Sequence, residues 1–263
     1  MSVQPDPSKP DLSKPDLSKI KLSVPQFAER FRGDMIPLGN TFSYFCADLP
    51  WGAEDLRDYL EEPISALPPN ISSQLPKVSI LLVPYISKSK PNDIVSMEKP
   101  PGDKLAFTTH IKIGAETVLA FGLKGQEVAE YHYRFYNQIA TIVADRSLKP
   151  GSSELDLAPF VGLVRDELIG QVHGEVDEDS WRAKQQIVRR AGKLKTDGKP
   201  FWTYVRHSFI DTLTLYLHGI CCDIDVDAGP RQLPSRFLRK RLLVLREFFP
   251  PPHGFAVLPE DMK

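Results

Sequence analysis

The fold of the C-terminal half is decided by residues 201–222, which read FWTYVRHSFIDTLTLYLHGICC. Apolar side chains in this stretch recur every three or four positions, which is the spacing of one face of an α-helix. That face comprises Val205, Phe209, Ile210, Leu213, Tyr216, Leu217 and Ile220. The stretch therefore predicts a long amphipathic helix.

The same helical spacing extends over the chain from Gln126 onward, and glycine or proline residues interrupt it at intervals. Between these interruptions the pattern predicts five helices, over residues 126–146, 158–173, 179–195, 201–222 and 234–249. We interpret residues 125–263 as a helical region that forms a five-helix bundle.

Residues 23–124 have a different pattern, in which short apolar or alternating runs are separated by turns. The pattern predicts strands over 41–49, 77–86, 105–113 and 118–123, and a turn over 114–117 joins the last two strands as a hairpin. It also predicts short helices over 25–31 and 54–61, and Pro63 is expected to end the second of these helices. Residues 87–104 are rich in proline, lysine and serine and are expected to form an exposed loop. This region is therefore predicted to be mixed and strand-rich.

Residues 1–22 repeat a short unit, PDPSK followed by two copies of PDLSK. Each copy is too polar to bury the surface that would offset its ordering entropy, so we interpret the segment as a disordered tail that acts as a spacer. The complete prediction is an α+β fold. A small strand-rich N-terminal half is packed on a five-helix C-terminal bundle, behind the disordered N-terminal tail.

Composition excludes several classes of protein. The formal net charge is -1, which gives no whole-molecule attraction to nucleic acid or to anionic membranes. Apolar runs are far shorter than the ~20 residues of a membrane span, and the N-terminus lacks the apolar core of a signal peptide. Cys46, Cys221 and Cys222 give neither a disulfide framework nor a CxxC zinc spacing, and the adjacent pair is interpreted as core filling. A soluble, cytoplasmic protein without a membrane partner is expected.

One polar strip runs along the predicted helix 201–222. His207, Asp211, Thr214 and His218 are three or four positions apart, so their side chains line one side of the helix over about three turns. Two imidazoles and a carboxylate are ligand types of zinc and of non-haem iron. The strip lies beside the apolar face rather than within it, so the alternative is the solvated edge of an amphipathic helix.

Two further residues interrupt the apolar faces of their helices. His132 lies in the middle of the apolar face of helix 126–146, and Glu167 projects among the apolar residues of helix 158–173. A buried imidazole or carboxylate needs a partner or a metal, the alternatives being a satisfied core histidine and a glutamate that reaches water. If three helices converge, the sequence predicts an iron or zinc site, with the candidate ligands His132, Glu167, His207, Asp211 and His218.

The spacing of His207 and Asp211 resembles that of the last ligand helix of haem-oxygenase-like di-iron oxidases. Those proteins place a further histidine about one turn after the aspartate, where Thr214 stands here. The HExxH and ExxH signatures of metal enzymes are also absent from this sequence, so no family is assigned.

Charges in the helical half are segregated by sign. Residues 154–179 are acidic, whereas helices 182–199 and 231–246 are basic. The basic helices could face the acids of their neighbours, or build one basic patch that binds phosphates or RNA. No aromatic interleaving or recognised motif supports nucleic acid, and the alternative is a solvated basic face. The candidate partner-binding residues are Arg236, Arg239, Lys240 and Arg241.

No GxSxG, P-loop or GxGxxG motif is present, and any Cys–His or Ser–His pair would have to be assembled by the fold, so whether the protein is an enzyme stays open. The first functional hypothesis is an interaction or ligand-binding protein that uses a charged helical face. The alternatives are a metal-dependent helical-bundle enzyme with a His/Asp/Glu site, and phosphate or nucleic-acid binding through the basic helices.

Overall fold

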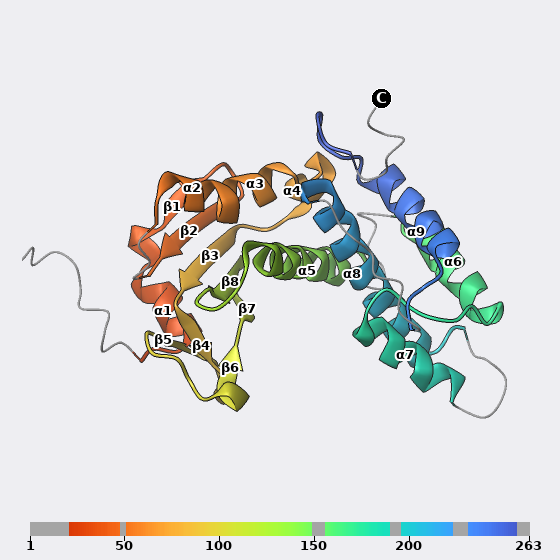
Figure 1. The fold of residues 1–263 in the computed structure, drawn as a ribbon, viewed down its shortest axis with the longest axis horizontal. Helices are drawn as coiled ribbons and strands as arrows, with labels where there is room; N and C mark the ends of the chain where they lie inside the picture. The colour runs from red at the N-terminus through yellow and green to blue at the C-terminus, as the bar shows by residue number, and fades with distance from the viewer. Residues whose placement is uncertain (1–20, 48–50, 149–155, 190–195, 223–230, 257–263) are drawn as a thin grey trace, which may run out of the picture. The chain divides into compact units, whose positions relative to one another are not determined.

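The structure is a computed structural model that describes residues 21–47, 51–148, 156–189, 196–222 and 231–256 (Figure 1). Residues 1–20 of the predicted tail lie outside this range. The described chain divides into two compact units. Their described parts are residues 21–38, 42–47 and 79–124 for the first unit, and residues 39–41, 51–78, 125–148, 156–189, 196–222 and 231–256 for the second.

The first unit contains a five-stranded sheet in the order β1-β2-β3-β8-β7. Its strands are β1 (Ile36–Leu38), β2 (Phe42–Cys46), β3 (Val78–Val83), β7 (Thr108–Ile113) and β8 (Glu116–Gly122). All the side chains of β3 are buried, as its nearly continuous aliphatic run predicts for a central strand. The strands confirm the predicted strand-rich character of the N-terminal half.

The hairpin of β7 and β8 is tighter than the sequence predicts. Ile113 pairs with Glu116, so the turn contains only Gly114 and Ala115 instead of residues 114–117. Gly114 has a φ of 61°, in the left-handed region that glycine adopts without strain. Glu116 and Thr117 are therefore free to extend β8.

A second, three-stranded sheet has the order β5-β4-β6. Its strands are β4 (Tyr85–Ser87), β5 (Ile94–Ser96) and β6 (Leu105–Ala106), and β4 pairs antiparallel with both neighbours. The prediction of an exposed loop over 87–104 is wrong at β5, because Val95 is fully buried in the core of this unit. One short apolar run inside a polar, proline-rich segment was enough to form an edge strand whose central residue is buried.

The short helix α1 (Val24–Arg30) packs into the same core. Ser23 and Gln26 form a capping box at its start, and Pro25 occupies the first turn, where its missing N–H is not needed. The buried Val24 and Phe27 are its main core residues. Two short 3-10 helices complete the described part of this unit, η2 (Arg32–Asp34) and η4 (Gly102–Lys104).

The second unit begins with α2 (Ala53–Leu56), the π-helix η3 (Arg57–Glu61), α3 (Glu62–Ser65) and α4 (Pro69–Gln74). The first three follow one another without a break, so the prediction that Pro63 ends the helix is wrong. Pro63 stands in the first turn of α3, immediately after the π turn, where the missing N–H of a proline costs little.

The C-terminal half contains the predicted five helices: α5 (Val128–Ser147), α6 (Ala158–Ile169), α7 (Glu178–Val188), α8 (Lys199–Cys221) and α9 (Ser235–Phe248). Residues 190–195 of the third predicted helix lie outside the described residues. α6 ends earlier than predicted, and Gln171 just beyond it has a φ of 53°, which is incompatible with continued helix.

α8 is the central helix of the second unit. It packs against α5, α7, α9 and α6, and Figure 1 shows it passing between α5 and α9. The apolar face predicted from its sequence is buried against these neighbours. No helix among the described residues has the length and apolar character needed to span a membrane.

Candidate functional site

A cluster of one imidazole and two thiols lies where α5 meets the C-terminal end of α8. His132 in α5 is only 4% exposed. Its Nδ1 lies 3.3 Å from Sγ of Cys222 and 3.9 Å from Sγ of Cys221. The three potential ligand atoms all lie within 4.8 Å of one another. We call His132, Cys221 and Cys222 the thiol–imidazole cluster.

The π-helix η3 fixes the orientation of the His132 ring. Nε2 of His132 lies 2.6 Å from the backbone oxygen of Asp58. Because a carbonyl oxygen can only accept a hydrogen bond, Nε2 carries the ring proton and donates it. In the neutral ring the lone pair is therefore on Nδ1, which faces the two sulfur atoms. Metal-binding histidines are commonly held in this way by a backbone carbonyl on the opposite nitrogen.

The cluster favours a thiolate on Cys221. A hydrogen bond with Cys222 is the largest influence and, with His132 and Tyr136, lowers the pKa of Cys221 to about 4 against the opposing effect of burial. Burial lowers the pKa of His132, but its hydrogen bonds to Cys221 and the Asp58 carbonyl outweigh burial and raise this pKa. Thiolates are the form of cysteine that binds metal ions.

His218 lies one helical turn before Cys221 on α8, at the i+3 spacing that places two side chains on one face, and Cys222 follows the end of the helix. Nε2 of His218 is buried and has no hydrogen-bond partner within the described residues. Burial and the neighbouring His132 lower the pKa of His218, which favours its neutral ring. His218 is therefore a further nitrogen donor on the face of α8 that carries Cys221.

Three of the predicted metal ligands lie outside the thiol–imidazole cluster. Glu167 is bound by Arg241, with 2.9 Å between Nε and Oε2 and 2.5 Å between Nη2 and Oε2. Asp211 accepts a hydrogen bond of 3.0 Å from the backbone N–H of Ser180. His207 is half-buried, and burial lowers its pKa. Of the five predicted ligands, only His132 is in the cluster and only His218 lies beside it.

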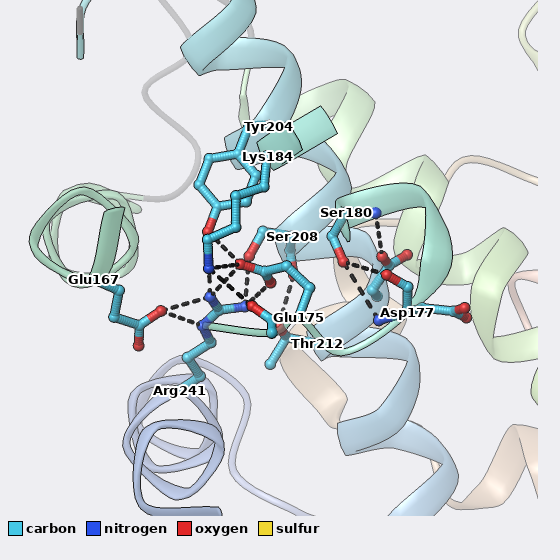
Figure 2. Close-up of polar contacts among 11 residues, drawn as sticks. Glu167, Glu175, Asp177, Ser180, Lys184, Tyr204, Ser208, Thr212 and Arg241 are labelled. Carbon is cyan, nitrogen blue, oxygen red and sulfur yellow. Dashed lines mark hydrogen bonds and ion pairs between the residues drawn. The ribbon is translucent and has the colours of Figure 1, made fainter. Parts of the chain in front are cut away.

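A buried charge network occupies the centre of the helices α6 to α9 (Figure 2). The guanidinium of Arg241 is fully buried and contacts Glu167, Glu175 and Ser208, at 2.8 Å to Glu175 Oε2 and 2.7 Å to Ser208 Oγ. Lys184 Nζ lies 3.0 Å from Glu175 Oε1 and also donates to the backbone oxygen of Gly174. Tyr204 donates to Glu175 as well.

The charges of this network balance. Two cations, Arg241 and Lys184, face two carboxylates, Glu167 and Glu175, so the network buries no net charge. Burial raises the pKa of Glu167 and opposes ionisation of Glu175, but Arg241 and Lys184 together hold the pKa of Glu175 below its usual range. Each charge has an opposite partner, which is the condition for tolerating charge in a core.

The partner-binding residues predicted on α9 divide into two groups. Arg236, Arg239 and Lys240 are exposed, as a docking surface requires. Arg241 is 0% exposed and belongs to the charge network, so it is not accessible to a partner. Helical spacing explains this, since Arg241 follows Leu238 at i+3 and shares its buried side.

Sequence reasoning assigned the cysteine pair to core filling and did not place it beside His132. A usable signal was present, because His132 was already anomalous on its own apolar face and Cys221 follows His218 at i+3 on the predicted helix. Comparison of the chain with protein-family models, with curated proteins and with solved structures found no match.

Proposed function

We propose that the helical unit binds a zinc ion through Nδ1 of His132 and the sulfur atoms of Cys221 and Cys222. Imidazole and thiolate are the preferred ligands of zinc, whereas non-haem iron sites combine histidine with carboxylate. The carboxylates of Glu167 and Asp211, predicted as ligands, are engaged elsewhere. Zinc is therefore favoured over iron.

The observation that carries this proposal is the spacing of the three ligand atoms. A tetrahedral zinc ion, with a Zn–N bond of about 2.0 Å and Zn–S bonds of about 2.3 Å, holds its nitrogen and sulfur ligands about 3.5 Å apart. The two Nδ1–Sγ distances, 3.3 and 3.9 Å, lie on either side of this value. Small side-chain adjustments are enough to place all three atoms around one ion.

Three protein ligands leave a fourth coordination position. Catalytic zinc sites keep this position for water or substrate, whereas structural sites fill it with a protein ligand. His218, with its unpartnered Nε2 on the same face of α8, is the residue best placed to fill it. The proposal therefore concerns zinc binding alone. Coordination by His218 would complete a closed, structural site, whereas without it the fourth position would be open to water or substrate.

Zinc titration of the reduced protein against a chromophoric chelator tests the proposal. We expect one zinc ion per chain, and a double variant Cys221→Ser/Cys222→Ser that no longer competes with the chelator. Cys46→Ser is the matched control, because Cys46 lies in the other unit and should leave zinc binding unchanged. If the reduced protein does not bind stoichiometric zinc, the proposal is wrong.

A second variant tests the proposal even if the double cysteine variant does not fold. His132→Gln retains an amide donor for the carbonyl of Asp58 but offers no nitrogen ligand in place of Nδ1. We expect zinc affinity to fall by more than the roughly 10- to 100-fold that an outer hydrogen-bond partner typically contributes. Zinc should also slow the reaction of Cys221 and Cys222 with a thiol reagent. Burial raises the pKa of Cys46 to about 12, so Cys46 reacts slowly with or without zinc.

We also propose an acidic protein surface as the partner of the exposed cations on α9. Arg236 and Lys240 are exposed, and their charged groups lie 4.7 and 5.8 Å from the ring centre of Phe237. Binding to polyglutamate should be lost in Arg236→Glu/Lys240→Glu and kept in Lys88→Glu/Lys112→Glu, a control with the same charge change in the other unit. Equal loss in both variants, or tighter binding of an RNA oligonucleotide than of polyglutamate, would contradict this proposal.

A further inference from the structure

A pocket of about 850 Å³ lies in the helical unit, lined by the end of α5, the first half of α6 and the first turns of α8. This volume is within the range of roughly 300–1,000 Å³ that is typical of small-molecule sites. The pocket is separate from the thiol–imidazole cluster, which is formed by the opposite end of α8. It is therefore considered as a separate candidate site.

The walls of the pocket are mainly apolar. Leu148, Leu157 and Val161 contribute aliphatic surface, and Trp202 adds an indole ring. Trp202 is 46% exposed, which is unusual for so large an apolar side chain. An apolar ligand body would cover this ring and the aliphatic wall together, and the burial of that surface favours binding.

Three cations line the same pocket, namely Arg165, Lys199 and Arg206. No acidic residue is found among the described residues that line it. Arg206 is partly neutralised by Asp145 at 2.8 Å, and the guanidinium of Arg165 lies 5.3 Å from the ring centre of Phe201. Lys199 is the first residue of α8, where the positive end of the helix dipole adds to its charge. The pocket is therefore complementary to one anionic group.

Ser147 supplies a second polar feature. It lines the pocket, is only 7% exposed, and its Oγ has no hydrogen-bond partner within the described part of the chain. A buried hydroxyl without a partner is uncommon, because burial without a hydrogen bond costs free energy. An oxygen acceptor on a bound ligand would satisfy this group.

We propose that this pocket binds a small amphipathic carboxylate, with an alkyl or aryl body on the apolar wall and the carboxylate among Arg165, Lys199 and Arg206. A free phosphate would satisfy the cations but would leave the aliphatic wall and Trp202 exposed to water. A neutral apolar molecule would cover the wall but would offer no anion to Arg165 and Lys199. A carboxylate on an apolar body satisfies both.

Calorimetric titration with dodecanoate tests the charge requirement. We expect one dodecanoate per chain, with binding at least about 10-fold tighter than that of dodecan-1-ol, kept below its solubility limit, or of dodecyltrimethylammonium, kept below its micelle concentration. The double variant Arg165→Gln/Lys199→Gln should lose most of this preference for dodecanoate and keep its affinity for dodecan-1-ol. Lys88→Gln/Lys112→Gln, in the other unit, is the matched control and should behave as wild type.

A steric variant tests the location. Ala158 lines the pocket and is exposed, so Ala158→Trp can be accommodated without repacking a core and should weaken dodecanoate and dodecan-1-ol alike. Quenching of Trp202 fluorescence on binding, absent in Trp202→Phe, places the ligand at the same wall. The proposal is overturned if the charge variant keeps the full preference for dodecanoate, or if Ala158→Trp binds both ligands as wild type does.

Discussion

Asp211 is a buried carboxyl of α8 whose ionisation couples the stability of the second unit to pH. It is 4% exposed and accepts a hydrogen bond from the backbone of Ser180, in the first turn of α7. The pKa of Asp211 is raised to about 7, mainly because the carboxyl is buried. The negative charges of Asp177 and Asp179 raise this pKa further, whereas the hydrogen bonds from Ser180 lower it. The carboxyl thus changes charge near neutral pH, inside a helix junction.

The sign of the pH effect follows from this raised pKa. Between about pH 4 and pH 7 the folded state binds a proton that the unfolded chain has released, so the free energy of unfolding falls as the pH rises. Asp211→Asn is neutral at every pH and can still accept from Ser180. We expect it to remove this decline and to be more stable than wild type at pH 8 by on the order of 1–4 kcal/mol.

Urea unfolding at pH 5 and at pH 8 measures this difference for wild type and Asp211→Asn. The free energy of unfolding of Asp211→Asn, relative to that of wild type, should be higher at pH 8 than at pH 5. A stability difference that is the same at pH 5 and pH 8 would mean that Asp211 does not titrate in this range. Asp166→Asn, an exposed carboxyl on α6, is the control and should show no such gain.

At the scale of elements, Arg241 links four helices of the second unit. It lies on α9 and reaches Glu167 on α6, Ser208 on α8 and Glu175, which in turn binds Lys184 on α7. Removing a single partner from a buried ion network leaves the remaining charge uncompensated, which typically costs about 3–5 kcal/mol. The position of α9 in the unit therefore depends on one buried side chain.

We expect Arg241→Met to lower the free energy of unfolding by about 3–5 kcal/mol, because it leaves two carboxylates to face Lys184 alone. Adding Glu167→Gln and Glu175→Gln to this variant should restore part of the loss, since the uncompensated charges are removed. Chemical denaturation of the three proteins measures both effects. Lys240→Met, at the exposed neighbouring position, should change stability by less than about 0.5 kcal/mol. An equal loss in both single variants would rule out the network as the cause.

The elements were predictable where a periodic pattern extended over several turns. All five C-terminal helices follow from the spacing of apolar residues, as in α8, whose apolar face is buried as predicted. Short elements were not predictable in this way. The strand β5 depends on Val95 finding a core formed by distant residues, and the winding around Pro63 depends on a π turn that has no sequence signature.

At the scale of the whole molecule, the candidate site was predictable only in part. The sequence identified His132 and Glu167 as polar residues on apolar faces, and both are buried. Their partners could not be found from one chain, because the carbonyl of Asp58 and the guanidinium of Arg241 are each 74 residues away along the sequence. Periodicity describes one helix at a time, whereas a site depends on the register between helices.

The second unit is discontinuous along the chain, since residues 51–78 belong to it and residues 79–124 do not. During synthesis on the ribosome, η3 emerges well before the helix that it must meet. The 74 residues from Asp58 to His132 take about 4–15 s to translate at roughly 5–20 residues per second. Throughout that interval the carbonyl of Asp58 lacks the imidazole that donates to it in the folded protein. The imidazole arrives next, and the thiols of Cys221 and Cys222 arrive last, so the order of translation is also the order in which the thiol–imidazole cluster is assembled.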